Sequence, residues 1–137
     1  MHTNIVICGG ALAGMTLALS LQSKGFDIVI IDPRDTKEVI EQDKRTTAIA
    51  AGPRSFYRDL GVWEKLNKKI EAINSISILD GSSSISLDFD YRDFTDENSD
   101  VDINSLGHVV ENSDLIKQIN LKINKNKKLG QVKRFKS

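Results

Sequence analysis

The sequence predicts an α/β fold in which a βαβ unit is followed by the beginning of an antiparallel sheet. Two apolar, β-branched runs, Ile5–Ile7 and Ile28–Ile31, are typical of buried parallel strands. Between them, Met15–Leu21 consists of good helix formers. Apolar and polar residues then alternate from Ile76 to Phe89, a pattern typical of a β-hairpin. Because the period changes from near four to two, the hairpin is expected in a sheet distinct from the first.

A turn of small residues joins the first strand to the helix, with the sequence Gly9-Gly10-Ala11-Leu12-Ala13-Gly14. Gly9 permits a tight turn, and Gly14 lets the helix pack closely on the sheet. The small residues Gly10 and Ala11 let the backbone approach a pyrophosphate, whose charge would meet the positive end of the helix. The turn therefore predicts a phosphate site.

An acid at the end of the second strand adds a second part to this site. Asp32 stands where a carboxylate can accept hydrogen bonds from both ribose hydroxyls. Strand, turn, helix and acid in register predict binding of a cofactor that ends in adenosine. The middle glycine of the usual motif is Ala11 here, which loosens the fit. The alternative is a βαβ unit with a purely structural role.

Composition narrows the class of protein. With 137 residues, 39% hydrophobic and 28% charged, the chain has the size and balance of one modest soluble domain. No apolar run is long enough to cross a bilayer, so the cytoplasm is the expected compartment. Nineteen basic and nineteen acidic residues balance, which gives no indication of a nucleic-acid partner. Two distant histidines, and acids without a calcium-loop pattern, predict no metal site.

The intervening elements follow from shorter signals. Pro33–Arg45 is predicted as a loop with room for a short helix, and Thr46–Ala50 as a brief extended segment. A helix should begin at Gly52-Pro53 and end at Gly61, with a second short helix over Val62–Ile70.

The last part of the chain predicts one more helix. Val109-Val110 indicates an extended segment, and Asn112 or Ser113 is a candidate cap for the helix that follows. The apolar face of that helix would be Leu115, Ile116, Ile119 and Ile123. Beyond Lys125 the sequence is predicted to be a basic, weakly patterned tail.

Three blocks of the chain resemble a known family, the flavin-dependent aromatic hydroxylases of ubiquinone biosynthesis, a branch of the para-hydroxybenzoate hydroxylase-like FAD monooxygenases. Gly9–Asp32 looks like the FAD-binding βαβ unit, and Asp43–Ala50 is similar to the family's Asp-x-Arg segment. Leu106–Asn112, followed by Leu115, resembles the strand-to-helix block after the first substrate-domain hairpin. The three blocks follow the family's order and spacing from residue 4 to 120, whereas a general dinucleotide-binding protein would match only the first block.

The resemblance implies a set of cofactor-binding residues. The turn would line the FAD pyrophosphate through Gly9, Gly10, Ala11, Leu12, Ala13 and Gly14. Asp32 would hold the adenosine ribose, and Arg45 would reach the phosphates or the ribityl chain, unless Arg45 is a surface arginine. His108 has a family position near the flavin, although a polar residue at a strand end explains it equally well. Ser113 replaces an arginine of many relatives.

The resemblance also implies a reaction. NAD(P)H would reduce FAD, and one atom of oxygen would be transferred to the ring of a polyprenylated phenol, a ubiquinone precursor. Such a substrate is compatible with peripheral contact at the inner face of the membrane. No side chain in the sequence is singled out as a general acid or base, so the catalytic residues and the oligomeric state stay open.

Family members are several times longer, so the sequence resembles a truncated amino-terminal fragment that is inactive alone. Its predicted parts are a Rossmann-like FAD-binding region (1–70), the start of a substrate domain (71–105), a strand and helix returning to the FAD domain (106–124), and the basic tail (125–137). Two alternatives stay open, an NAD(P)-binding reductase and a non-catalytic nucleotide-binding fragment. A reductase should continue with alternating helices and parallel strands.

Overall fold

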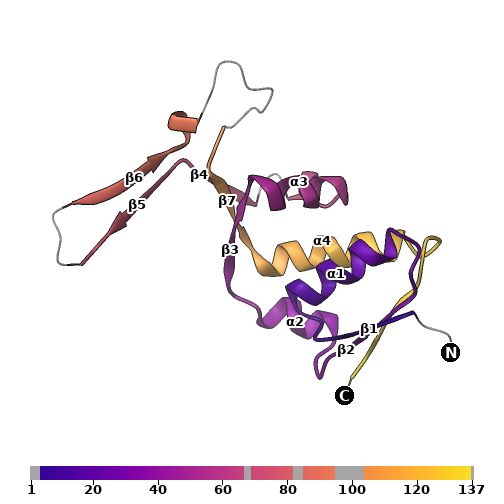
Figure 1. Cartoon of the computed structure of the whole chain (residues 1–137). Coiled ribbons are helices and arrows are strands. Elements are labelled where there is room, and N and C mark those ends of the chain that lie inside the picture. The colour runs from indigo at the N-terminus through magenta and orange to yellow at the C-terminus, as the bar shows by residue number, and fades with distance from the viewer. Residues whose placement is uncertain (1–3, 67–68, 82–84, 95–103, 137) are drawn as a thin grey trace.

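A computed structural model describes residues 4–66, 69–81, 85–94 and 104–136. Its described strands form a parallel sheet, an antiparallel sheet and a separate hairpin, and four α-helices accompany them (Figure 1). The predicted α/β class, with a parallel βαβ unit and the beginning of an antiparallel sheet, is confirmed. Within these described ranges, no helix has both the length and the apolar character needed to cross a membrane.

The parallel sheet has the order β1-β2-β8. Strand β1 (Ile5–Cys8) and strand β2 (Ile28–Ile31) are the two predicted apolar runs, and α1 (Leu12–Gln22) connects them. Ile28, Val29 and Ile30 are all buried, because strands lie on both sides of β2. The βαβ unit therefore forms as its sequence predicts.

Strand β8 (Val132–Phe135) corrects the prediction of a weakly patterned tail. It pairs in parallel with β2, with Val132 opposite Ile28 and Phe135 opposite Ile31. Its four residues are partly buried or exposed, so the sequence here lacks the continuous apolar run from which a buried strand is predicted. The pairing depends on β2, a strand about a hundred residues earlier in the chain.

Helices α1 and α4 (Asn112–Lys125) pack against each other and carry much of the core (Figure 1). The predicted apolar face of α4 is confirmed, since its four apolar residues are buried: Leu115, Ile116, Ile119 and Ile123. In α1 the buried residues include Met15, Ala18 and Leu19, whereas Leu17 is 49% exposed. The predicted cap is also wrong, because Glu111 occupies the N-cap position and Asn112 is the first helical residue.

Helix α2 (Thr36–Gln42) is the short helix for which the predicted loop Pro33–Arg45 left room. Asp35 accepts a hydrogen bond from the Glu38 amide at 2.8 Å, and the Asp35 amide donates to the Glu38 carboxylate at 2.6 Å. This reciprocal capping box fixes the start of the helix, and Val39 anchors the helix in the core.

The second sheet is antiparallel and has the order β3-β7-β4. Strand β3 (Thr46–Ala50) and strand β7 (Gly107–Glu111) were predicted as extended, whereas β4 (Ile70–Ile73) was not. Helix α3 (Ala51–Asp59) follows β3. The predicted helix over 62–70 is wrong for its described residues: Trp63–Lys65 forms a 3-10 turn, and Ile70 pairs with Val110 of β7.

The predicted hairpin is confirmed as β5 (Ser75–Leu79) and β6 (Ser86–Asp90), with a 3-10 turn at Tyr91–Phe94 after it. Ile76 lies opposite Phe89 and Ile78 opposite Leu87, so these four side chains share one face. The hairpin projects away from the two helix-covered sheets (Figure 1). Ile76, Ile78 and Leu87 consequently remain about half exposed.

Candidate cofactor site

The turn between β1 and α1 depends on two glycines. Gly9 has a φ of 101°, a conformation that L side chains rarely adopt, and its amide donates to the Ile31 carbonyl at 2.8 Å. A Cβ at Gly14 would overlap the Gly9 carbonyl oxygen. Gly9 thus permits the turn, and Gly14 permits the close approach of α1 to it.

The amino end of α1 offers its backbone to an anion. The N-cap residue is Ala11, which supplies no side-chain hydrogen bond, and the first turn of the helix contains no acid. The first amides of a helix lack intrahelical acceptors and lie at the positive end of its dipole. Ala11, Leu12 and Ala13 therefore present the small, uncapped surface that a pyrophosphate requires.

Asp32 lies immediately after β2, beside the same turn, and only 3% of it is exposed. The amides of Gly10 and Arg34 donate to its two carboxylate oxygens at 2.7 and 2.9 Å. Burial opposes ionisation, but these amides together with the charge of Arg134 bring the pKa of Asp32 below its usual value. An ionised acceptor is thus fixed at the carboxyl edge of the sheet.

A hollow of about 400 Å³ lies over this edge, where its lining includes Cys8, Gly9, Gly14, Asp32 and Arg34. Free cysteines are usually buried, but Cys8 is exposed. It ends β1, an outer strand of the parallel sheet, so no described strand covers that side.

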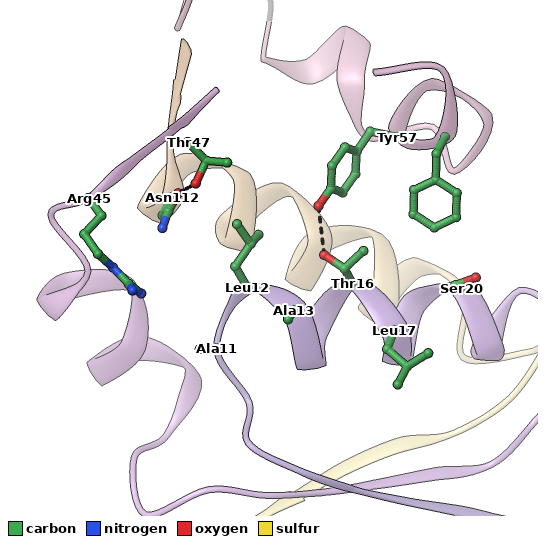
Figure 2. Close-up of a pocket in the computed structure, with 11 residues that line it drawn as sticks. Ala11, Leu12, Ala13, Thr16, Leu17, Ser20, Arg45, Thr47, Tyr57 and Asn112 are labelled. Atoms are coloured by element: carbon green, nitrogen blue, oxygen red, sulfur yellow. Dashed lines mark hydrogen bonds between the residues drawn. The ribbon is translucent and has the colours of Figure 1, made fainter. Parts of the chain in front are cut away.

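A larger cavity of about 720 Å³ runs from the turn along α1 to the second sheet. Figure 2 shows Arg45 and Asn112 at the end of this cavity nearest Ala11, with Tyr57 and Thr16 farther along α1. Thr16 and Tyr57 share a hydrogen bond of 3.1 Å across the cavity. The cavity is lined by Ala11, Leu12, Ala13, Thr16, Leu17, Ser20, Arg45, Thr47, Phe56, Tyr57 and Asn112.

Arg45 is held by a polar network that the sequence did not reveal. Its guanidinium donates to both oxygens of Asp43, through Nε at 2.9 Å and Nη2 at 2.7 Å. Asn112 donates to Asp43 at 3.3 Å and accepts from Thr47 at 2.6 Å. The Arg45 side chain remains 74% exposed and lines the cavity. Asp43, Asn112 and Thr47 therefore orient an accessible cation toward the phosphate turn.

The structure brings all the predicted site residues to one region. The larger cavity is lined by Ala11, Leu12, Ala13 and Arg45. The adjoining hollow is lined by Gly9, Gly14 and Asp32, and also by Ala11 and Ala13, which contact both spaces. Gly10 lies buried between them and donates to Asp32. Sequence reasoning missed Thr16, Tyr57 and Asn112, because a polar residue on a helix gives no local sign that it faces a cavity.

His108 lies apart from this cavity, inside β7 between Ile49 of β3 and Ala72 of β4. Its ring contacts Trp63 edge-on, with ring centroids 5.5 Å apart. Burial, helped by the nearby charge of Arg54, lowers the pKa of His108. His108 is not among the described residues that line the larger cavity.

Comparison with known proteins decides the family, since residues 2–118 match the FAD binding domain. The chain belongs to the FAD binding domain family. This match covers the phosphate turn, Asp32 and Arg45, as well as both strands that flank Arg45 and Asn112 in the second sheet. FAD is accordingly the cofactor of the domain family to which the chain belongs.

Two of the curated relatives of this FAD binding domain are named as hydroxylases of ubiquinone or of a ubiquinol. A ubiquinone hydroxylase, UbiL, of Rhodospirillum rubrum is 33% identical over 88 residues, which are 63% of this chain and 20% of the relative. A 3-demethoxyubiquinol 3-hydroxylase of Escherichia coli is 35% identical over 65 residues, 45% of this chain and 17% of the relative. The chain thus spans about a fifth of the length of these relatives.

Solved structures confirm the fold. The p-nitrophenol 4-monooxygenase PnpA of Pseudomonas putida superposes with a TM-score of 0.70 at 13% identity. The superposition covers 96% of this chain and 31% of the other. The described strands and helices therefore form an architecture that is also found within this monooxygenase.

The residues present fit FAD. Gly9 and Gly14 form a turn that additional Cβ atoms would disrupt, and the uncapped end of α1 suits two phosphates. Asp32 is a fixed acceptor for a ribose, and Arg45 is a cation beside the continuing cavity. The site therefore offers an acceptor suited to a ribose, an uncapped helix end suited to a pyrophosphate and a cation farther along the cavity.

Proposed function

We propose that this chain binds FAD and forms the cofactor-binding part of a monooxygenase that hydroxylates the aromatic ring of a ubiquinone precursor. The observation that carries the proposal is the continuous surface from Asp32, past the uncapped end of α1, to Arg45. The names of the curated relatives support the substrate class. A polyprenylated phenol is the substrate proposed, with NAD(P)H as electron donor and peripheral membrane contact as its route of access.

Each residue of the site has a proposed task. The amides at Ala11, Leu12 and Ala13 bind the pyrophosphate, and Asp32 accepts hydrogen bonds from the adenosine ribose. Arg45, held by Asp43, binds anionic or hydroxyl oxygens farther along the cofactor. When bound, FAD supplies the electron transfer and oxygen chemistry, while these residues bind and orient it.

The first expected result is that the purified chain binds FAD more tightly than NAD. The Asp43-x-Arg45 and Leu106–Leu115 blocks favour FAD over NAD, because they resemble the flavin-dependent family and lie within the matched FAD binding domain. Titration calorimetry with FAD and with NAD, together with flavin fluorescence, measures both affinities. Arg45→Met should weaken FAD binding, on the order of tenfold for the loss of a charge-assisted contact.

Arg58→Met is the matched control for Arg45→Met, because Arg58 is an exposed arginine of α3 whose guanidinium donates to Ser55 Oγ. It should leave FAD binding unchanged. Tighter binding of NAD than of FAD would reject the flavin assignment and favour a nicotinamide-dependent reductase.

The second expected result is that these 137 residues bind cofactor without turnover and tend to associate. The apolar face of the β5–β6 hairpin is half exposed, and exposed apolar faces and strand edges promote association. Light scattering, binding of a hydrophobic dye and oxygen consumption with NAD(P)H and a phenolic substrate measure these properties. Ile78→Asn should reduce dye binding, whereas Ser77→Asn on the polar face should not.

A monodisperse chain that binds no dye and couples NAD(P)H oxidation to hydroxylation would overturn this expectation. Such a result would mean that reduced cofactor is protected from water within these residues alone.

A further inference from the structure

Arg134 of β8, near the far end of the chain, contacts the backbone of the phosphate turn and Asp32. Its side chain is 13% exposed. Its Nε donates to the Arg34 carbonyl at 2.9 Å, and its Nη1 donates to the Gly10 carbonyl at 3.1 Å and to Thr36 Oγ1 at 3.4 Å. Nη2 lies 3.5 Å from Asp32 Oδ1. One guanidinium thus joins the phosphate turn, Asp32 and the start of α2, a task suited to its forked set of donors.

The same guanidinium explains why residue 10 is glycine. A Cβ at Gly10 would lie 2.5 to 2.6 Å from the Nη1, Cζ and Nη2 atoms of Arg134. The sequence suggested that a small residue here makes room for a pyrophosphate. In the structure, the missing side chain also makes room for Arg134, which could move away only by giving up its bonds to Gly10 and Arg34.

We propose that Arg134 is a positioning residue for the cofactor site, which holds the Asp32 carboxylate and the Gly10 backbone in the arrangement that receives the adenosine ribose. This inference rests on the proposed binding of FAD. It adds to the site a residue of the third parallel strand, about a hundred residues beyond the βαβ unit.

The charges around Asp32 allow the role of Arg134 to be separated from that of its neighbours. Arg34, in the segment after β2, faces Asp32 through its amide and through Nε at 3.4 Å, but its side chain is 41% exposed. Lys136, the other cation at this end of β8, pairs instead with Asp35 and Glu38 of the α2 capping box. Arg134 is therefore the better shielded of the two cations that contact Asp32, and screening by water weakens it less.

The test without cofactor measures the titration of Asp32 by carboxyl NMR. Arg134→Ala should raise the pKa of Asp32, because the buried carboxylate loses a charge that favours ionisation. Arg134→Lys should give Asp32 an intermediate pKa, since lysine keeps the positive charge but lacks the forked donors of the guanidinium. Lys133→Ala removes an exposed cation from the same strand and should leave the Asp32 titration unchanged. An unchanged pKa in Arg134→Ala would overturn the inference.

A double-mutant cycle tests whether the Arg134 side chain occupies the space that a side chain at Gly10 would need. Gly10→Ala should lower the urea midpoint of the parent chain, and should have less than about half that effect in the Arg134→Ala background. Equal effects in both backgrounds would show that Gly10 is not constrained by Arg134. If Arg134→Ala fails to fold, the same cycle with Arg134→Lys provides the comparison.

Titration of FAD links the inference to the proposed function while keeping their failures distinct. Arg134→Ala should weaken FAD binding by about tenfold at neutral pH, and its affinity should fall at a higher pH than that of the parent as the solution is acidified. Failure of the parent to bind FAD would reject the proposed function, and the NMR result would still decide the role of Arg134. A parent that binds FAD, with Arg134→Ala matching its affinity and pH profile, would reject the inference alone.

Discussion

Valine in place of Gly14 should abolish FAD binding and destabilise the fold by roughly 3 kcal/mol, the upper part of the usual range for adding atoms to a packed site. A Cβ at this position would overlap the Gly9 carbonyl oxygen, and the Ile7 side chain lies 3.4 Å away. The backbone of the turn cannot rotate away as a flexible side chain would. Helix α1 must therefore shift, which displaces the amides proposed to bind the pyrophosphate.

Urea unfolding and calorimetric titration with FAD measure the two effects of Gly14→Val. Gly52→Val is a suitable control, because Gly52 is also a helical glycine and a Cβ there would meet no atom within 4 Å. A Gly14→Val chain that unfolds and binds FAD like the parent would mean that α1 does not approach the turn as described.

Alanine in place of Asp43 should lower the free energy of unfolding by roughly 2 to 3 kcal/mol and weaken FAD binding. Asp43 is 7% exposed and accepts hydrogen bonds from Arg45 and Asn112, so its removal leaves the buried amide of Asn112 without this acceptor. Arg45 would also lose the contact that orients it toward the cavity. Glu41→Ala, which removes an exposed acid of α2, should change neither property measurably.

The effect of Asp43→Ala should depend on pH in a defined direction. The Arg45 side chain, aided by the Arg45 and Asn112 amides and opposed by burial, holds the pKa of Asp43 well below its ordinary value of 3.8. A carboxyl whose pKa is depressed by folding stabilises the fold above the unfolded value, and this contribution is lost as the pH falls through the folded value. The difference in stability between parent and variant should therefore be full near neutrality and shrink below about pH 3.8.

Denaturant titrations of both chains between pH 2 and pH 7 would measure this difference. A difference that widens on acidification would mean that Asp43 is not the stabilising acceptor that its contacts indicate.

Local patterns explain why much of the fold could be predicted. The apolar run of β2, the glycines around α1 and the alternation of β5 and β6 each lie within a few residues, so each reports its own element. The candidate cofactor-binding residues could be predicted for the same reason, because the turn and Asp32 belong to one βαβ unit. Which of these residues contact FAD stays a prediction.

Long-range contacts explain what the sequence did not reveal. Val132–Phe135 has too short an alternation to identify a strand, and its pairing with β2 appears only once the chain folds. Ile70 was predicted as the end of a helix because it continues an apolar spacing, yet it begins the strand Ile70–Ile73, which pairs with β7. The roles of Asn112 and Arg134 likewise depend on partners in distant segments.

The position of β8 has a consequence for how the protein is made. Strand β2 lies between β1 and β8, but β8 follows it by about a hundred residues. A ribosome that has completed β2 must therefore synthesise the whole antiparallel sheet and the hairpin before the outer edge of β2 can be paired. During that interval an apolar strand edge is open to other nascent chains, and such late, non-local pairing slows folding. Chaperone demand should consequently be highest between the emergence of β2 and that of β8.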